Sequence, residues 1–260
     1  MSENQDHNLL IQVLDSHPVT PVKADRSENL LAGYSPTLKT LLVDGFRISY
    51  IGELSSFESP NLQSALQNPE IVSAKLMKEI EAGRVVGPFK APPFPIFRTS
   101  PIGIVSRKAP NEFRLIHHLS YPKGSSVNDF IPDECSSVHY ATISDAIHIL
   151  KKLGVGCFLA KTDIKSAFRI IPVHPLEYPL LGIKWTNEYY FDRCLAIGLR
   201  SSCAIFEKFS SSLEWLQHLH VSAVLHILDD FLCIAPSRVK CGEDLHKFLD
   251  MCNFLGVPIA

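Results

Sequence analysis

The sequence predicts an α+β fold built on a split βαβ unit, in which helices cover one face of an antiparallel sheet. The first observation behind this prediction is that, from Cys157 onward, short apolar runs of strand length alternate with segments whose apolar residues recur at helical spacing. The second is their order, which reads β-α-β-β-α-(β) once an early hairpin is set aside. In such a unit we expect the first and second strands to lie side by side at the centre of the sheet.

The N-terminal third predicts little regular structure apart from one helix. Residues 1–28 are polar and are expected to form a flexible, irregular arm. Residues 68–82 predict a helix, because Asn68 can cap its start, apolar residues follow at helical spacing, and Gly83 ends it. The many prolines in residues 87–101 predict an extended connector.

The central part predicts a hairpin and a second helix. Residues 102–106 and 112–119 are strand-like and flank the turn A-P-N. Ser144 is expected to cap a helix with Ile147 and Leu150 facing inward, which stops before Gly154.

The C-terminal part supplies the split βαβ unit. The run C-F-L-A-K-T-D is typical of a buried strand and ends on Asp163. P-L-L-G-I-K-W and Y-Y-F-D-R-C predict the early hairpin, and Ser201 and Ser202 open a helix. V-L-H-I-L and F-L-C-I-A flank Asp229 and Asp230, which predicts a tight hairpin with carboxylates at its tip. A helix over 243–255 and the strand-like V-P-I-A follow.

Composition favours a globular, intracellular protein, without deciding between nucleus and cytoplasm. Hydrophobic residues make up 46% of the chain, yet no apolar run approaches the roughly 20 residues of a membrane span, and the N-terminus does not resemble a signal peptide. We therefore expect no membrane partner. The seven cysteines include no C-x-x-C pair, which argues against a zinc site or a disulfide framework.

Charge is unevenly distributed along the chain. Residues 84–123 hold seven basic residues and one acid, a charge of +6, so the rest of the chain carries −8 for the total of −2. A basic segment beside an acidic remainder suits a protein that binds phosphates in one place and metal ions in another. A solvated basic face is an equally good explanation of the charge alone.

The convergence of Asp163, Asp229 and Asp230 predicts a metal site. Carboxylates at the ends of neighbouring strands repel one another unless cations compensate them, and hard oxygen ligands favour Mg²⁺ or Mn²⁺. Two such ions can activate a hydroxyl and neutralise a leaving pyrophosphate, which is what nucleotidyl transfer requires. An Asp pair in a turn is often only a solvated turn, but here both neighbouring segments are apolar strands.

Four blocks, in order, resemble the fingers hairpin and palm motifs of reverse transcriptases: S-P-I-G-I-V-S-R-K-A-P-N-E-F-R-L-I-H-H-L, K-T-D-I-K-S-A-F-R-I-I-P-V, C-L-A-I-G-L-R-S-S-C-A-I-F and H-I-L-D-D-F-L. The stretch R-L-I-H-H-L-S-Y-P-K-G-S-S-V-N-D-F is most similar to retrotransposons that carry a tyrosine recombinase, the DIRS-like group. The resemblance implies a right-hand polymerase: an arm over 1–28, an N-terminal extension and fingers over 29–156, and a palm over 157–260 that is expected to be truncated before its last strand, with the thumb absent. Its thumb and RNase H domain would follow as further parts of a polyprotein.

The resemblance also implies the roles of single residues, with a primed RNA or DNA template and dNTPs as partners. Two ions, Mg²⁺ or Mn²⁺, would be held by Asp163, Asp229, Asp230 and the backbone carbonyl of Ile164. The incoming nucleotide would contact Arg107, Lys108 and Arg114 from the fingers, the backbone amides of Lys165 and Ser166, the Phe168 ring under the sugar, and the turn at Ile197 and Gly198.

Several alternatives stay open at this point. Ile227 stands where the family usually has Tyr, and Cys203 where many relatives have Pro. A catalytically silent, truncated or repurposed fragment that only binds nucleic acid or a partner is the rival outside enzymes. An RNA-dependent RNA polymerase shares the palm, but a bulky Phe168 disfavours a 2′-hydroxyl.

Single residues also have alternative explanations. Phe168 could equally be core and Arg114 an exposed strand residue. We interpret His117 and His118 as structural, since adjacent strand residues face opposite ways.

Overall fold

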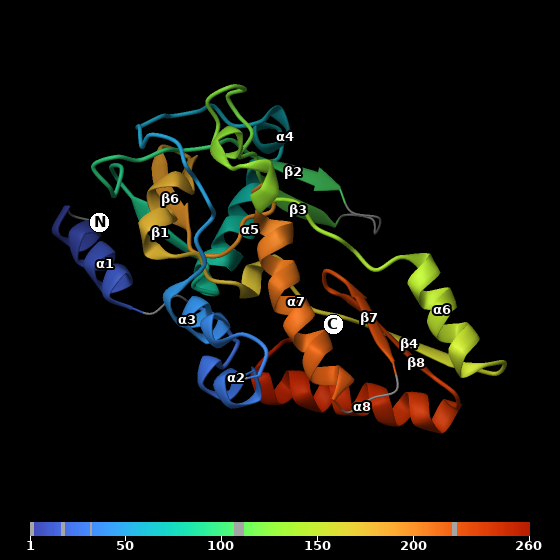
Figure 1. The fold of residues 1–260 in the computed structure, drawn as a ribbon. Coiled ribbons are helices and arrows are strands. Elements are labelled where there is room, and N and C mark those ends of the chain that lie inside the picture. The colour runs from blue at the N-terminus through green and yellow to red at the C-terminus, as the bar shows by residue number, and fades with distance from the viewer. Residues whose placement is uncertain (1–2, 17–18, 32, 107–111, 220–222) are drawn as a thin grey trace. The chain divides into compact units, whose positions relative to one another are not determined.

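The computed structural model describes residues 3–260 apart from 17–18, 32, 107–111 and 220–222 (Figure 1). The chain forms two compact units that interleave along the sequence. The first unit consists of Met1–Val19, Asp44–Ser136 and Ile171–Ser202, and the second of Thr20–Val43, Ser137–Ile170 and Cys203–Ala260. The sequence predicted two consecutive parts that meet between residues 156 and 157. Each observed unit is instead made of three separate stretches of chain.

The first unit contains an antiparallel sheet of order β1-β6-β5 and a separate hairpin, β2-β3. The hairpin confirms the strands predicted around A-P-N, with Ile102 opposite His117 and Val105 opposite Arg114. The early hairpin of the C-terminal half joins this unit because β6 pairs with β1, Val85 opposite Asp192. The elements are α1 (Glu3–Asp15), α4 (Gln63–Leu66), α5 (Pro69–Glu81), β1 (Val85–Phe89), β2 (Ile102–Ser106), β3 (Phe113–His117), η1 (Asn128–Phe130), η2 (Asp133–Cys135), η4 (Pro175–Leu180), β5 (Gly182–Trp185) and β6 (Glu188–Asp192).

The apolar face of α5 anchors the core of this unit. Val72 and Leu76, one helical turn apart, are buried together with Ile102 of β2 and Trp185 of β5. The Trp185 indole nitrogen donates to the Ser73 hydroxyl across 2.9 Å, so its polar edge is satisfied inside the core. The helix begins and ends where the sequence predicts.

The second unit contains the antiparallel sheet β4-β8-β7. The strand beside β4 is therefore β8, the third strand of the unit, and the prediction that the first and second strands are neighbours is wrong. The two-residue turn between β7 and β8 still brings the carboxylates to β4, because Asp163 lies opposite Asp230. The elements are α2 (Ala24–Leu31), α3 (Pro36–Asp44), α6 (Ile143–Leu153), β4 (Phe158–Asp163), η3 (Ala167–Ile170), most of α7 (Ser202–His218), β7 (Val224–Ile227), β8 (Asp230–Ala235) and α8 (Arg238–Leu255).

Helices α7 and α8 pack on the same face of this sheet. His226 and Phe231 are directly opposed across β7 and β8 and therefore share a face. His226 contacts Glu214 of α7, and the Phe231 ring lies 4.8 Å from that of Phe248 of α8. The α+β prediction with helices on one face is confirmed for these two helices.

The opposite face of the sheet carries the carboxylates, and the prediction that β4 is buried is wrong. Leu159 is 53% exposed, and Lys161 and Asp163 follow it at the two-residue spacing that keeps side chains on one face. Ile227, at the end of β7, is also exposed. An apolar strand sequence does not distinguish a core strand from one whose side chains are partly exposed.

Two further expectations differ from the structure. The arm is not irregular throughout, since Glu3–Asp15 and Ala24–Leu31 are helical. Thr142, and not Ser144, caps α6, because its hydroxyl accepts from the Asp145 amide while the Asp145 carboxylate accepts from the Thr142 amide. Helix α6 has the predicted amphipathic pattern but no buried residue, and its Ile147 is exposed. Among the described residues, no helix combines the length and apolarity needed to cross a membrane.

Candidate active site

The turn between β7 and β8 holds the paired aspartates. Ile227 pairs with Asp230, so Leu228 and Asp229 alone form the loop. Leu228 has a φ of 55°, a left-handed conformation that is unusual for a leucine and costs about 1 kcal/mol or more. A tight hairpin with carboxylates at its tip, as predicted, is the observed structure.

The register of β4 and β8 brings the third aspartate to that tip. Asp163, the last residue of β4, lies directly opposite Asp230, the first residue of β8. The Ile164 amide donates to the Asp229 carbonyl across 3.0 Å, which extends the pairing one step beyond the strand ends. The structure thus brings together Asp163, Asp229, Asp230 and Ile164.

The two neighbouring carboxylates act electrostatically on Asp163. Burial raises the pKa of Asp163, and the negative charges of Asp229 and Asp230 raise it further, while Lys161 opposes them. Lys161 Nζ lies 2.9 Å from Asp230 Oδ1, and this contact raises the pKa of the lysine. The Lys161 ammonium group therefore balances part of the negative charge of the three aspartates.

The donor atoms suit a hard divalent cation, although their arrangement does not yet form its shell. Carboxylate and carbonyl oxygens are the ligands that Mg²⁺ and Mn²⁺ prefer. Within the described ranges, however, no three acidic, histidine or cysteine side chains converge closely enough to hold an ion. Asp230 Oδ1 contacts the Lys161 ammonium group instead.

The segment that follows Asp163 is held by the end of the chain. The Lys165 amide donates to the Pro258 carbonyl across 2.8 Å, and Ile164 forms an antiparallel bridge with Ile259. The Lys165 amide predicted to meet a triphosphate thus has a protein partner. Ser166 is exposed with a φ of 60°, and its predicted contact with nucleotide stays a prediction.

Phe168 lies in η3 and is partly buried. Its ring packs edge-on against Phe206 of α7, with ring centres 5.6 Å apart and planes at 82°. This contact fixes the ring five residues beyond Asp163 and leaves part of it accessible. Such a position is compatible with a sugar contact and with a role in packing.

The remaining predicted nucleotide contacts belong to the first unit. Arg114 is an exposed residue of β3, and Ile197 and Gly198 lie in the turn after β6. Gly198 has a φ of 121°, and a Cβ there would lie 2.1 Å from the His117 carbonyl oxygen. Close backbone packing is thus sufficient reason for this glycine. Arg107 and Lys108 lie outside the described residues.

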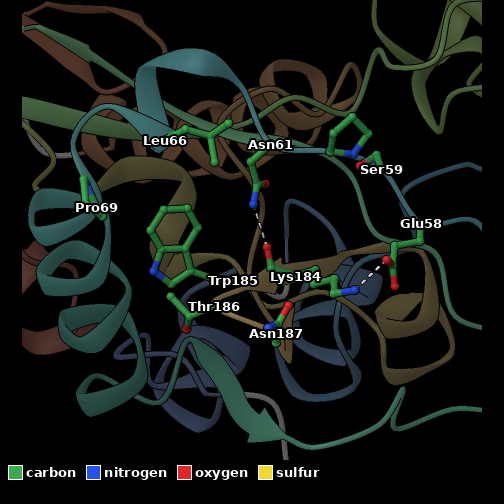
Figure 2. Close-up of a pocket in the computed structure, with 10 residues that line it drawn as sticks. Glu58, Ser59, Asn61, Leu66, Pro69, Lys184, Trp185, Thr186 and Asn187 are labelled. Carbon is green, nitrogen blue, oxygen red and sulfur yellow. Dashed lines mark hydrogen bonds and ion pairs between the residues drawn. The ribbon is translucent and has the colours of Figure 1, made fainter.

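A pocket of about 580 Å³ opens elsewhere on the first unit (Figure 2). Asn61 Nδ2 donates to the Lys184 carbonyl across 2.8 Å, and the Lys184 ammonium group lies 2.6 Å from Glu58 Oε1. The walls include Trp185 and Leu66 but none of the predicted site residues. It is not the predicted site.

Lys161 is the neighbour of the site that sequence reasoning missed. The available signal was the two-residue spacing from Asp163, which places both side chains on one face of a strand. The prediction that β4 is buried did not allow for an exposed face that carries this lysine.

Comparisons with known proteins converge on one fold. No family model matches the chain. The genome polyprotein of Petunia vein clearing virus is 23% identical over 118 residues, which is 45% of this chain and 5% of the polyprotein. The native prototype foamy virus protease-reverse transcriptase has a TM-score of 0.58 at 17% identity, covering 100% of this chain and 33% of that one. The foamy viral enzyme in complex with an RNA/DNA hybrid gives 0.60 at 12% identity, with 100% and 33% coverage.

These solved structures share the mixed helical and antiparallel architecture along the whole chain, so the fold is reverse-transcriptase-like. The chain spans about a third of the length of these two neighbours and a small part of the viral polyprotein.

Proposed function

We propose that this chain is the fingers-and-palm part of an RNA-directed DNA polymerase from a retroelement. The observation that carries the proposal is the opposition of Asp163 and Asp230 at the ends of β4 and β8, with Asp229 in the adjoining turn. Its occurrence in a reverse-transcriptase-like fold makes nucleotidyl transfer the chemistry that the site suits best. The substrates would be dNTPs and a primer on an RNA or DNA template.

Asp163, Asp229, Asp230 and the Ile164 carbonyl would hold two divalent ions, Mg²⁺ or Mn²⁺. When bound, these ions supply activation of the primer hydroxyl and neutralisation of the pyrophosphate. Leu159 and Ile227 lie on the same face of the sheet as Asp163 and are exposed, so they would provide apolar surface for the primer end. Asp230 would exchange its contact with Lys161 for a metal contact.

Other residues would select and orient the nucleotide. Phe168 would lie against the sugar and exclude a 2′-hydroxyl, which favours dNTPs over rNTPs. The backbone amide of Ser166, an exposed residue, would donate to the triphosphate. Arg114, with Arg107 or Lys108, would bind it from the fingers by charge-assisted hydrogen bonds.

The motifs favour a retrotransposon of the DIRS-like, tyrosine-recombinase group as the source. R-L-I-H-H-L-S-Y-P-K-G-S-S-V-N-D-F supports this finer assignment. In such an element the chain would act beside a thumb and an RNase H domain of the same polyprotein.

A catalytically silent relative is the second candidate, and one observation favours it. Lys161 pairs with Asp230 across 2.9 Å, so one of the three carboxylates already has a cationic partner. A silent protein would bind a primed template without extending it. Extension of a DNA primer on an RNA template, measured with and without Mg²⁺ or Mn²⁺, separates the two candidates.

A further inference from the structure

A buried asparagine holds the turn that contains Gly198. Asn128 is only 8% exposed and begins the short η1 helix. Its Nδ2 donates to the Gly198 carbonyl and to the Ser120 hydroxyl, each across 2.8 Å. Its Oδ1 accepts from the Arg200 amide across 2.8 Å. Every hydrogen-bonding atom of this carboxamide end therefore has a partner.

The chemistry of the contact depends on asparagine. A carboxamide carries the same donor and acceptor as a peptide group, so Asn128 pairs with Gly198 and Arg200 as a neighbouring strand would. Aspartate has the same shape, but its ionised carboxylate cannot donate to the Gly198 carbonyl. Serine is too short to span both partners.

The end of β3 also contacts this turn. The His117 amide donates to the Ile197 carbonyl across 3.1 Å, and the His117 carbonyl oxygen packs against Gly198. Asn128 and His117 thus both contact the backbone at Ile197 and Gly198. Gly198 itself is exposed, so the backbone at this turn is accessible from solvent.

The Arg200 side chain reinforces these contacts. One of its guanidinium nitrogens donates to the carbonyls of Asn128 and Ile131, across 3.4 and 3.2 Å. The other forms an ion pair with Asp133. The Asn128 side chain therefore contacts the backbone of the turn, and the Arg200 side chain contacts the backbone at and after η1.

We infer that Asn128 is a positioning residue, which holds the Ile197–Gly198 backbone in the conformation that receives the nucleotide and template. This inference rests on the proposed polymerase function and deepens it. Asn128 is buried behind the turn and acts through Gly198, without touching substrate. Its removal should loosen substrate binding far more than it slows the chemical step.

The test compares Asn128→Asp and Asn128→Ser with Ser120→Ala in the full chain. Ser120→Ala is a matched control, because it removes one partner of the same Nδ2 and leaves the contacts with Gly198 and Arg200. Melting curves give the folded fraction, fluorescence anisotropy gives the Kd for a primed RNA template, and single-nucleotide incorporation gives KM and kcat. We expect both Asn128 variants to raise the KM for dNTP or the template Kd at least about tenfold, with kcat within about threefold and Ser120→Ala unchanged.

The pH dependence of template binding is a second measurement on Asn128→Asp. Below the pKa of the introduced carboxyl group, its protonated form can again donate to the Gly198 carbonyl, so template binding should recover as pH falls, unlike that of Asn128→Ser. If KM and Kd are unchanged in the folded fraction of either Asn128 variant, Asn128 is not a positioning residue. Primer extension by the wild-type chain in the same experiment would still support the proposed polymerase function. If the wild-type chain neither binds nor extends a primed template, the proposed function fails first, and the inference fails with it.

Discussion

Lys161 Nζ lies 2.9 Å from Asp230 Oδ1, so a lysine two residues before Asp163 balances one charge of the acidic cluster. The lysine and Asp163 share a face of β4, opposite the face that packs on α7 and α8. The contact is exposed to solvent on both sides. An exposed ion pair is weak, so a divalent ion can displace it.

Replacement of Lys161 by alanine should therefore strengthen metal binding. Without the competing ammonium group, Asp230 is free for an ion, and the Kd for Mn²⁺ should fall about threefold, a change in the range expected of an exposed pair. Titration of Mn²⁺ by electron paramagnetic resonance measures this without any catalytic readout. Lys152→Ala on the exposed face of α6 is the control, and equal affinities in both variants would show that Lys161 does not compete for Asp230.

The accessible ring of Phe168 should determine sugar choice. Phe168→Val removes the ring from the space that a 2′-hydroxyl would need, so the dNTP/rNTP preference should fall at least about tenfold, equivalent to roughly 1.4 kcal/mol. Single-nucleotide incorporation of both nucleotide types measures it. Because Phe168 packs on Phe206, Phe206→Leu controls for loosened packing. A preference that changes only in Phe206→Leu, or in neither variant, would assign Phe168 to the core.

His226 should make the second unit more stable at acidic than at alkaline pH. Its Nδ1 contacts Glu214, and its Nε2 lies 3.0 Å from Glu207 Oε1, both on α7. Burial lowers the pKa of His226, but the hydrogen bond and charge of Glu214, with the charge of Glu207, raise it more. The folded pKa thus exceeds the unfolded value near 6.5, and the stabilisation is complete below about pH 6.5 and lost as pH rises through the folded pKa.

His226→Gln should lower the free energy of unfolding by about 3 kcal/mol near pH 6, since it leaves two carboxylates without their cation. It should also flatten the pH dependence of stability on the alkaline side. Urea unfolding between pH 5 and pH 9 measures both effects. His246→Gln removes an exposed pair with Asp250 on α8 and should leave the curve near wild type. A wild-type slope retained in His226→Gln would assign the pH dependence to another group.

Local sequence signals predicted most of the elements and the acidic tip. Asp229 and Asp230 between two apolar strands predicted the hairpin, because the turn had to be as short as the gap between the runs. The neighbour of β4 was predicted wrongly, since pairing order depends on contacts across about 70 residues of chain and not on any local pattern. The exposure of β4 and α6 was missed for a related reason: periodicity shows which residues are apolar, not what covers them.

The parts of the site that depend on long-range hydrogen bonds could not be predicted. Asn128 and Gly198 are 70 residues apart, and V-N-D-F has no feature that predicts a partner for its asparagine. The Pro258 carbonyl meets the Lys165 amide across a still longer separation. Such contacts follow from the packing of whole segments, which a single sequence does not specify at the level of atoms.

Primer extension by aspartate variants tests the central claim most directly. The wild-type chain, Asp163→Asn, Asp229→Asn and the control Asp250→Asn on the exposed surface of α8 are compared on a DNA primer annealed to RNA, with Mg²⁺, with Mn²⁺ and with chelator. We expect extension by the wild type and the control only when a divalent ion is present, and none by Asp163→Asn or Asp229→Asn, since each loses a ligand charge. Extension by either of those two variants, or by the wild type in chelator, would contradict a metal-dependent polymerase site at these carboxylates.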